Sequence, residues 1–214
     1  IYEESYNKAF KKFYADPQEI CILALLPSYL ERDGSSLIYM VDDLLKQSKH
    51  PKSGYFLHDL ASLYQTLLSL KETKQKTILI GVTYALLDFA EQFKIDFPEL
   101  IVMETGGMKG KRKEMIRQEL HEILCTSFGV KNIHSEYGMT ELLSQAYSYG
   151  KGIFNCPPWM KILLRDTSDP LSLLKGKQSG GINVIDLANI NSCSFIATQD
   201  LGKLHNDGSF EILG

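Results

Sequence analysis

Continuous apolar runs of strand length, separated by stretches with helical spacing, restrict the fold of this chain more than any other feature. Ile20–Leu26, Thr77–Val82 and Leu100–Met103 are such runs. Strands that are apolar on both faces belong inside a sheet that helices cover on both sides. The alternation predicts an α/β fold with a parallel sheet, helices on both faces and right-handed crossovers. The predicted helices are Glu4–Phe13, Leu37–Lys46, Asp59–Leu70, Tyr84–Phe93 and Lys113–Phe128.

The pattern changes after about residue 150. Short strand patterns follow the pair Pro157-Pro158, and His205-Asn206-Asp207-Gly208 has the composition of a hairpin turn. We therefore expect a βα-repeat subdomain over residues 1–150 and a small β-rich subdomain, an antiparallel sheet or partial barrel, over residues 151–214. Its predicted strands are Met160–Leu164, Gly181–Leu187, Ser194–Ala197 and Phe210–Leu213.

Composition excludes several classes of protein. Of the 214 residues, 44% are apolar and 23% charged, as in ordinary globular domains, and the net charge is −3. Without a long run of one charge or an apolar run of about 18 residues, we expect neither nucleic-acid binding nor a membrane span. The four scattered cysteines fit reduced thiols in a cytoplasmic protein. Position 1 is not Met, and the first residues read as a helix already under way, so we expect a piece of a longer chain.

A polar segment, His134–Glu141, lies where the predicted strand Lys131–Tyr137 meets a predicted helix, Thr140–Tyr149. Ligands of open α/β sheets bind beside such junctions. An aromatic ring can stack on a base, a hydroxyl can bind a phosphate, and a carboxylate can hold Mg²⁺. The alternative is structural, because Thr140 also suits a helix N-cap and Glu141 the first turn of a helix. The two interpretations are compatible, since an N-cap faces an anion-binding position.

Two further segments have both a structural and a functional interpretation. Gly106 and Gly107 follow a predicted strand, where a glycine pair forms a tight turn or lets a ligand approach the backbone. Asp200 is expected between two short strands, either as a turn former or as an acceptor for a ribose diol.

A basic cluster and the remaining reactive side chains are less informative. Lys109, Lys111, Arg112 and Lys113 are expected at a helix start, where cations oppose the helix dipole. They form either a solvated patch or the surroundings of an anion. Cys156 is expected to be structural, and His121 to be a surface or helix-face residue.

Taken in order, these segments resemble the adenylate-forming superfamily. Glu104-Thr105-Gly106-Gly107 resembles its adenine-binding glycine motif, and Tyr137-Gly138-Met139-Thr140-Glu141 its Tyr-Gly-x-Thr-Glu motif. Thr198–Gly202, followed by Asn206-Asp207-Gly208, resembles its ribose-binding Asp motif. The form of the motifs is most similar to the acyl-protein synthetase branch of bacterial luminescence, and next to phenylacetate-CoA-ligase-like enzymes.

The resemblance implies an ATP-dependent acid–thiol ligase. Such enzymes activate a carboxylic acid, here a fatty or aryl acid, as acyl-AMP with Mg²⁺, and pass the acyl group to coenzyme A or a protein cysteine. By position, Tyr137 would stack on adenine, with Gly106, Gly107 and Gly138 in the cofactor site. Thr140 would bind the α-phosphate, Glu141 would hold Mg²⁺, and Asp200 would bind the ribose hydroxyls.

The sequence also departs from the family. It lacks the upstream Ser/Thr/Gly-rich phosphate loop and the C-terminal lid domain with its catalytic lysine, and Gln199 replaces the usual glycine before the ribose Asp. We therefore expect the chain alone to be inactive. Two alternatives remain at this stage: a non-catalytic nucleotide-binding or scaffold module derived from the fold, and an unrelated α/β protein that binds a cofactor.

Overall fold

The computed structural model describes residues 1–26, 34–107, 110–113, 115–174 and 179–213. By their contacts these residues form two compact units. The α/β unit comprises Tyr14–Ser135, and the β-rich unit comprises Ile1–Phe13 together with the chain from Glu136 onward. This division falls at residue 135 rather than at residue 150, and the first helix groups with the later residues.

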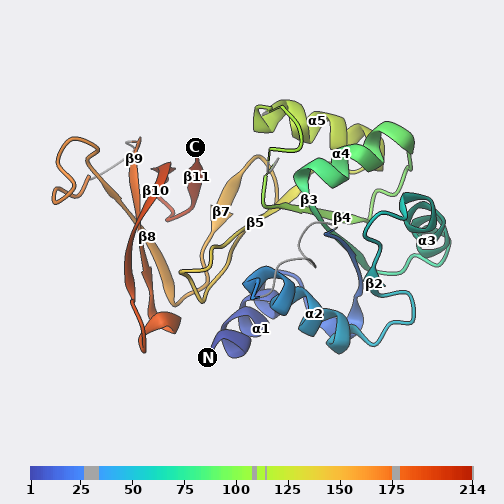
Figure 1. Cartoon of the computed structure of the whole chain (residues 1–214), viewed down its shortest axis with the longest axis horizontal. Helices are drawn as coiled ribbons and strands as arrows, with labels where there is room; N and C mark the ends of the chain where they lie inside the picture. The colour runs from blue at the N-terminus through green and yellow to red at the C-terminus, as the bar shows by residue number, and fades with distance from the viewer. Residues whose placement is uncertain (27–33, 108–109, 114, 175–178, 214) are drawn as a thin grey trace. The chain divides into compact units, whose positions relative to one another are not determined.

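The α/β unit contains the predicted parallel sheet (Figure 1). Its strand order is β2-β1-β3-β4-β5, and every neighbouring pair is parallel. The central strands β1 and β3 are buried along their whole length, which explains why their sequences are apolar without alternation. The strands are β1 (Cys21–Leu25), β2 (Gly54–Tyr55), β3 (Thr77–Val82), β4 (Ile101–Thr105) and β5 (His134–Tyr137).

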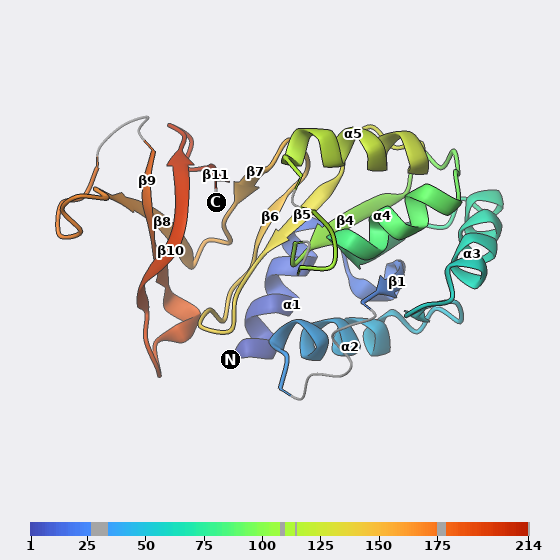
Figure 2. The same cartoon turned by 45° about the horizontal axis from the view of Figure 1, so that its top comes forward.

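Helices cover both faces of this sheet, as predicted. Figures 1 and 2 show α4 and α5 together on one side of β3 and β4, with α2 on the opposite side. Helices α2 and α3 begin at side-chain caps: Ser35 accepts from the Ile38 amide, and Asp59 accepts from the Ser62 amide. The helices are α2 (Ser36–Ser48), α3 (Leu60–Glu72), α4 (Thr83–Gln92) and α5 (Arg117–Phe128), and a 3₁₀ turn, η1 (Pro17–Glu19), precedes β1.

The β-rich unit contains an antiparallel sheet, again as predicted. Its strands run in the order β6-β7-β11-β10-β9-β8. The predicted hairpin at 205–208 joins β10 to β11, with Leu204 opposite Phe210. The elements are α1 (Tyr2–Phe13), β6 (Ala146–Ser148), β7 (Ile153–Asn155), β8 (Met160–Arg165), β9 (Ser179–Asp186), η2 (Leu187–Asn189), β10 (Phe195–Leu204) and β11 (Phe210–Ile212).

The core of this unit lies on one face of the antiparallel sheet. Its buried side chains come from β6 to β9, from β11 and from the segment after β5, and they include Leu142, Phe154, Ile162, Val184 and Phe210. Helix α1 has buried residues of its own, among them Tyr6 and Phe10. The core extends to the segment that carries the Tyr-Gly-x-Thr-Glu motif, and so holds that motif close to the sheet.

Three sequence-based predictions of local structure are wrong. Residues 140–149 form no helix: two turn residues, 140 and 141, are followed by four residues outside any helix or strand and then by β6. Helix α5 begins at Arg117 rather than at Lys113. The segment around Asp200 is not a connection between two strands, because it lies within β10, where the register with β9 shifts between Ala197 and Leu201.

Burial explains the first of these errors. Residues 144–148 are all buried, so side chains on both faces of this segment contact protein. A strand inside a sheet satisfies that requirement, whereas a surface helix leaves one side exposed. The apolar residues of the segment are compatible with either element, which is why the sequence alone did not distinguish them.

Candidate functional site

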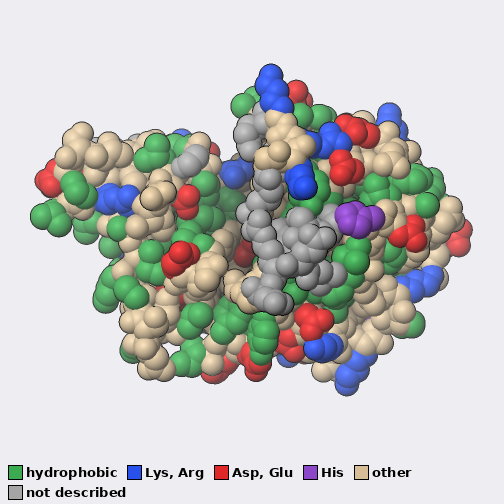
Figure 3. Space-filling view, viewed as in Figure 1, with side chains coloured by type: hydrophobic (Ala, Val, Ile, Leu, Met, Phe, Trp, Pro, Cys, Tyr) green, Lys and Arg blue, Asp and Glu red, His purple; other side chains and the backbone are tan. Residues whose placement is uncertain are grey.

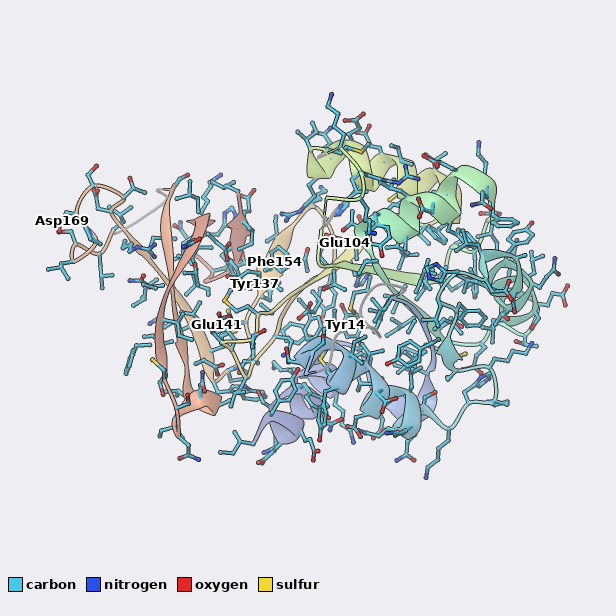
Figure 4. The ribbon with its side chains drawn as sticks, in the orientation of Figure 1. Tyr14, Glu104, Tyr137, Glu141, Phe154 and Asp169 are labelled. Atoms are coloured by element: carbon cyan, nitrogen blue, oxygen red, sulfur yellow. The ribbon has the colours of Figure 1, made fainter. Side chains whose placement is uncertain are left out.

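Tyr137 and Asp200, 63 positions apart in sequence, form a direct hydrogen bond. The Tyr137 hydroxyl donates to Asp200 Oδ2 at 2.6 Å. The ring of Tyr137 packs edge-on against Phe154 and Phe210, with centroid distances of 6.0 and 5.8 Å. Figure 4 shows Tyr137 next to Phe154, with Glu141 nearby in the same unit. Two of the predicted site residues therefore lie side by side.

Burial and the Asp200 carboxylate both act on Tyr137. Burial raises the pKa of the phenol, and the hydrogen bond to the negatively charged Asp200 raises it further. The hydroxyl is therefore protonated at neutral pH and remains a hydrogen-bond donor. The pair fixes the orientation of the aromatic ring relative to the carboxylate.

A β-bulge in β10 presents Asp200. The amide of Asp200 donates to Thr198 Oγ1 at 3.2 Å, and that hydroxyl donates to the carbonyl of Ile182 on β9 at 3.0 Å. Arg165, on β8, donates to the carbonyls of Ile182 and Thr198 at 2.7 and 2.5 Å. Bulges re-aim a side chain at the cost of ladder hydrogen bonds, and the Arg165 guanidinium supplies replacements.

Gly181 leaves room for this arginine. A Cβ atom at position 181 would lie 2.6 Å from the Arg165 guanidinium carbon. Sequence reasoning did not identify Arg165 or Thr198 as supporting residues. Thr198 lay within the Asp200 motif, but nothing in the sequence placed Arg165 across the sheet from it.

The remaining motif residues of the β-rich unit are on its surface. Gly138, Thr140 and Glu141 are exposed. Because residues 140–149 are not helical, Thr140 is not an N-cap and Glu141 does not interact with a helix dipole, so those structural interpretations are wrong. A Cβ atom at Gly138 would lie 2.5 Å from Glu136 Oε1, so a side chain there would displace the Glu136 carboxylate.

Gly106 and Gly107 belong to the α/β unit and follow β4. Their φ angles are 75° and 65°, a left-handed conformation that favours glycine. Both are exposed, and the position of a Cβ at Gly107 is open space. The backbone at the end of β4 is therefore accessible, as the predicted glycine turn requires.

A buried carboxylate, Glu104, stands immediately before this turn. It accepts from Thr83 Oγ1 at 3.0 Å, and its Oε1 lies 3.7 Å from Nε2 of His121. Burial raises the pKa of Glu104, but the neighbouring side chains of His121 and Ser135 and the positive charge of Arg117 together lower it more, so the group is a carboxylate at neutral pH.

Of the two expected positions for His121, the helix face is the one observed: it lies on α5 with only 11% of its side chain exposed. Its position three residues before the buried Leu124 of α5 was the available signal.

The basic cluster lies in the connection before α5, not at the helix start. Arg112 forms ion pairs with Asp88 and Glu91 of α4, the latter at 2.6 Å. The anions next to Arg112 are therefore the carboxylates of Asp88 and Glu91, which belong to the protein itself. Lys111 and Lys113 are exposed, and Lys109 lies outside the described residues. On the face in Figure 3, the described basic and acidic side chains are interspersed and form no continuous basic surface.

Cys156 is partly buried beside the core of the β-rich unit. Burial raises the pKa of its thiol to about 12, with a contribution from the negative charge of Asp186. A thiol with this pKa is a poor nucleophile at neutral pH, in agreement with a structural role.

The described residues contain no group of three or more His, Cys, Asp or Glu side chains that could bind a metal ion by themselves. Nor does the described part of the chain include a helix that is long and apolar enough to cross a membrane. Glu141 is thus a single exposed carboxylate. Mg²⁺ commonly binds one or two carboxylates together with substrate phosphates.

Comparison with solved structures confirms the fold implied by the resemblance. ATP-bound MatB from Rhodopseudomonas palustris superimposes with a TM-score of 0.71 at 16% identity, over 100% of this chain and 43% of MatB. O-succinylbenzoate coenzyme A synthetase (MenE) from Bacillus subtilis, in complex with ATP and magnesium, gives 0.60 at 18% identity, over 96% of this chain and 43% of MenE. The N-terminal domain of FACL13 from Mycobacterium tuberculosis gives 0.64 at 12% identity, over 100% of this chain and 55% of that domain.

No protein-family model matches the chain, and no curated protein matches its sequence. The structural matches nevertheless define the fold: it is that of part of the N-terminal domain of adenylate-forming enzymes. The chain spans less than half the length of MatB and MenE.

Proposed function

We propose that this chain forms part of an enzyme that activates a carboxylic acid with ATP and transfers the acyl group to a thiol. The observation that carries this proposal is the Tyr137–Asp200 pair. In adenosine, one bond joins the base to the ribose, so a protein that binds both needs a stacking ring and a diol acceptor next to each other. The 2.6 Å hydrogen bond between these side chains supports such an arrangement.

Within this proposal Tyr137 stacks on adenine and Asp200 accepts hydrogen bonds from the ribose hydroxyls. Asp200 Oδ2 already bonds to Tyr137, and its other carboxylate oxygen is assigned to the diol. The exposed backbone at Gly138 lets the nucleotide approach closely. The role of Gly106 and Gly107 in lining adenine stays a prediction from the resemblance, and the proposal does not depend on it.

Thr140 and Glu141 are assigned to the phosphates. The Thr140 hydroxyl would donate to the α-phosphate, the site of attack by the substrate carboxylate. Glu141 would hold the Mg²⁺ that neutralises the charge developing on the phosphoryl oxygens as pyrophosphate leaves. The solved neighbours MatB and MenE bind ATP, the latter with magnesium.

The proposal also assigns the acid that is activated and the thiol that accepts the acyl group. We assign a fatty or aryl acid as substrate and a thiol, either of coenzyme A or of an acyl-acceptor protein, as acceptor, in a cytoplasmic reaction. The phosphate loop and catalytic lysine of such enzymes are not among these 214 residues. The chain is therefore assigned to the nucleotide and magnesium contacts, and not to the complete reaction.

Exchange of pyrophosphate into ATP tests the assignment of Glu141. In the full-length protein, Glu141→Ala is expected to slow acid-dependent exchange about 100-fold, or about 2.7 kcal/mol, because a carboxylate ligand of Mg²⁺ is lost. Glu99→Ala, which changes an exposed glutamate of the α/β unit, is the matched control and should exchange normally. Normal exchange by Glu141→Ala would refute the role of this residue.

The same assay distinguishes the proposal from a non-catalytic module of the same fold. A full-length protein that binds ATP or AMP in calorimetry but shows no exchange with any acid of a fatty and aryl panel would be such a module. A protein that binds neither nucleotide would contradict both interpretations.

A further inference from the structure

A buried carboxylate, Asp186, holds the segment that carries Thr140 and Glu141. Asp186 is fully buried at the end of β9. Its Oδ2 accepts from the amide of Leu143 at 2.8 Å, and its Oδ1 accepts from the hydroxyl of Ser144 at 2.6 Å. The amide of Ala188 donates to the same Oδ1 at 3.1 Å. The Asp186 side chain therefore joins the corner between β9 and η2, residues 186–189 (the β9–η2 corner), to Leu143 and Ser144.

A second side chain of the same corner contacts Glu141 itself. Asn189, at the end of η2, is 4% exposed, and its Nδ2 donates to the backbone carbonyl of Glu141 at 2.7 Å. The contact leaves the Glu141 side chain free to point outward, because only the backbone is engaged. Asp186 and Asn189 together hold the segment at two points.

Ser144 is also fixed from another side. The indole Nε1 of Trp159 donates to Ser144 Oγ at 3.0 Å, while Ser144 donates its proton to Asp186. The backbone of the same Trp159 accepts from the amide of Leu187 at 2.9 Å. The corner and the segment are therefore tied by side chains and backbone at once.

These contacts matter because regular structure does not organise this segment. Residues 138–145 belong to neither a helix nor a strand. A buried carboxylate is destabilising unless several donors surround it, and hydrogen bonds to an ionised oxygen are stronger than neutral ones. An apolar side chain would fill the same space without that requirement. What the carboxylate adds is a defined position for the Leu143 amide and the Ser144 hydroxyl.

We propose that Asp186 and Asn189 are positioning residues that fix Thr140 and Glu141 for the nucleotide phosphates and Mg²⁺. The inference rests on the proposed function for the chemistry that the segment performs. The two residues are assigned no contact with nucleotide or metal, and act through the backbone at Glu141 and Leu143 and the hydroxyl of Ser144. Displacement of a reacting group by about 1 Å can reduce a rate about 100-fold.

The test compares Asn189 with Asn191, a nearby asparagine just after the corner, in the full-length protein. Asn189→Ala removes the hydrogen bond to Glu141, whereas Asn191→Ala changes an exposed asparagine two residues later and is the control. Hydrogen exchange of the amides at residues 141–144 is expected to be about tenfold faster in Asn189→Ala than in the control. Its kcat for ATP–pyrophosphate exchange should fall about tenfold with KM for ATP changed by less than about threefold. The Mg²⁺ concentration for half-maximal rate should rise.

Asp186→Asn is a second, independent variant. In this variant an NH₂ group replaces one carboxylate oxygen, and this group cannot accept a hydrogen bond. One of the three donors around Asp186 therefore loses its acceptor, and hydrogen exchange at the Leu143 amide should increase most. If this variant does not fold, Asn189→Ala alone decides the matter. Identical amide exchange and kinetics in Asn189→Ala and Asn191→Ala would overturn the inference, as would a loosened segment with unchanged kcat and Mg²⁺ dependence.

The two proposals fail in different ways. A wild-type protein without pyrophosphate exchange refutes the proposed function. Whether the β9–η2 corner holds residues 138–145 is then decided by amide hydrogen exchange alone. Equal exchange rates in Asn189→Ala and Asn191→Ala would show that it does not.

Discussion

At the scale of single residues, the hydrogen bond between Tyr137 and Asp200 is the most informative contact. Each residue has an ordinary structural explanation alone, Tyr137 as a strand end and Asp200 as a turn former. Their contact at 2.6 Å makes those separate explanations insufficient, because it brings two motif residues to one place. The Asp186 carboxylate shows the same principle, since two of its partners, Leu143 and Ser144, lie more than 40 positions earlier in the sequence.

His134 provides a residue-scale prediction about pH. It lies in β5, with its Nδ1 3.3 Å from the Tyr14 hydroxyl, and burial lowers the pKa of its imidazole from 6.5 to about 4. The unfolded chain therefore binds a proton that the folded chain does not, and stability falls as pH falls from about 6.5 to about 4. After allowance for solvent screening, we expect His134 to account for about 1 kcal/mol of the loss at pH 5.

Urea unfolding at pH 7 and pH 5 measures this effect. His134→Gln should lose less stability between the two pH values than the wild type, because glutamine does not titrate. His58→Gln, at an exposed histidine, should behave as the wild type. An unchanged pH dependence in His134→Gln would mean that the imidazole titrates normally in the folded state.

At the scale of elements, irregular segments as well as regular strands position the candidate site. The parallel strands and their helices follow from apolar periodicity, whereas a bulge in β10 presents Asp200 and a segment without regular structure carries Thr140 and Glu141. Bulges are frequent beside functional sites because they redirect a side chain. Arg165 and the β9–η2 corner supply the hydrogen bonds that these irregular segments cannot make within themselves.

Arg165 gives a prediction for the bulge. In the full-length protein, Arg165→Lys keeps the charge but loses the planar set of donors that reaches the carbonyls of Ile182 and Thr198. We expect a loss of stability of about 1–2 kcal/mol and about tenfold weaker AMP binding in calorimetry. Lys161→Ala, at an exposed position of the same strand, should leave both unchanged. Normal AMP affinity in Arg165→Lys would show that the geometry of the bulge does not affect nucleotide binding.

Gly129 gives a prediction for the end of α5. Its φ is 67°, and a Cβ there would lie 2.6 Å from the Cα of Asp96. Gly129→Ala therefore combines left-handed strain with a backbone clash, and should destabilise the protein by about 2–4 kcal/mol. Gly208→Ala, where φ is 87° and the space is open, should cost about 1 kcal/mol. Equal unfolding free energies for the two variants would show that the backbone around Asp96 moves easily.

At the scale of the whole molecule, the chain has the fold of part of the N-terminal domain of adenylate-forming enzymes, at 12–18% identity. At that identity the fold is conserved while side chains are not, so function has to be argued from the site. The contacts divide the chain into an α/β unit and a β-rich unit, and the first helix belongs to the latter. The pair on which the proposal rests lies within one unit.

Nucleotide binding gives a prediction at this scale. AMP at 100 times its Kd should stabilise the full-length protein by about 2.7 kcal/mol and raise Tm by several degrees. Asp200→Asn should reduce this rise, because the amide is a weaker partner for the ribose diol, while it can still accept from Tyr137. Inorganic phosphate at the same concentration is the control. An equal rise in wild type and Asp200→Asn would remove Asp200 from the nucleotide site.

Much of the fold could be predicted from the sequence, because apolar periodicity is local. β3 was predicted with its observed bounds, and α5 ends at the predicted residue, Phe128. The hairpin at 205–208 is likewise a local signal. The motif residues were found in the same way, as short groups of neighbouring residues.

Only the tertiary structure decided what those local signals could not. Residues 140–149 have a composition compatible with a helix, but contacts on both sides make 146–148 a strand. Arg165, Asp186 and Asn189 support the candidate site from strands and turns distant in sequence, and His121 turns inward to Glu104. The sequence determines which residues can form each element, because those preferences act over a few positions. Which side chains meet depends on packing across the whole sheet, and no local pattern encodes it.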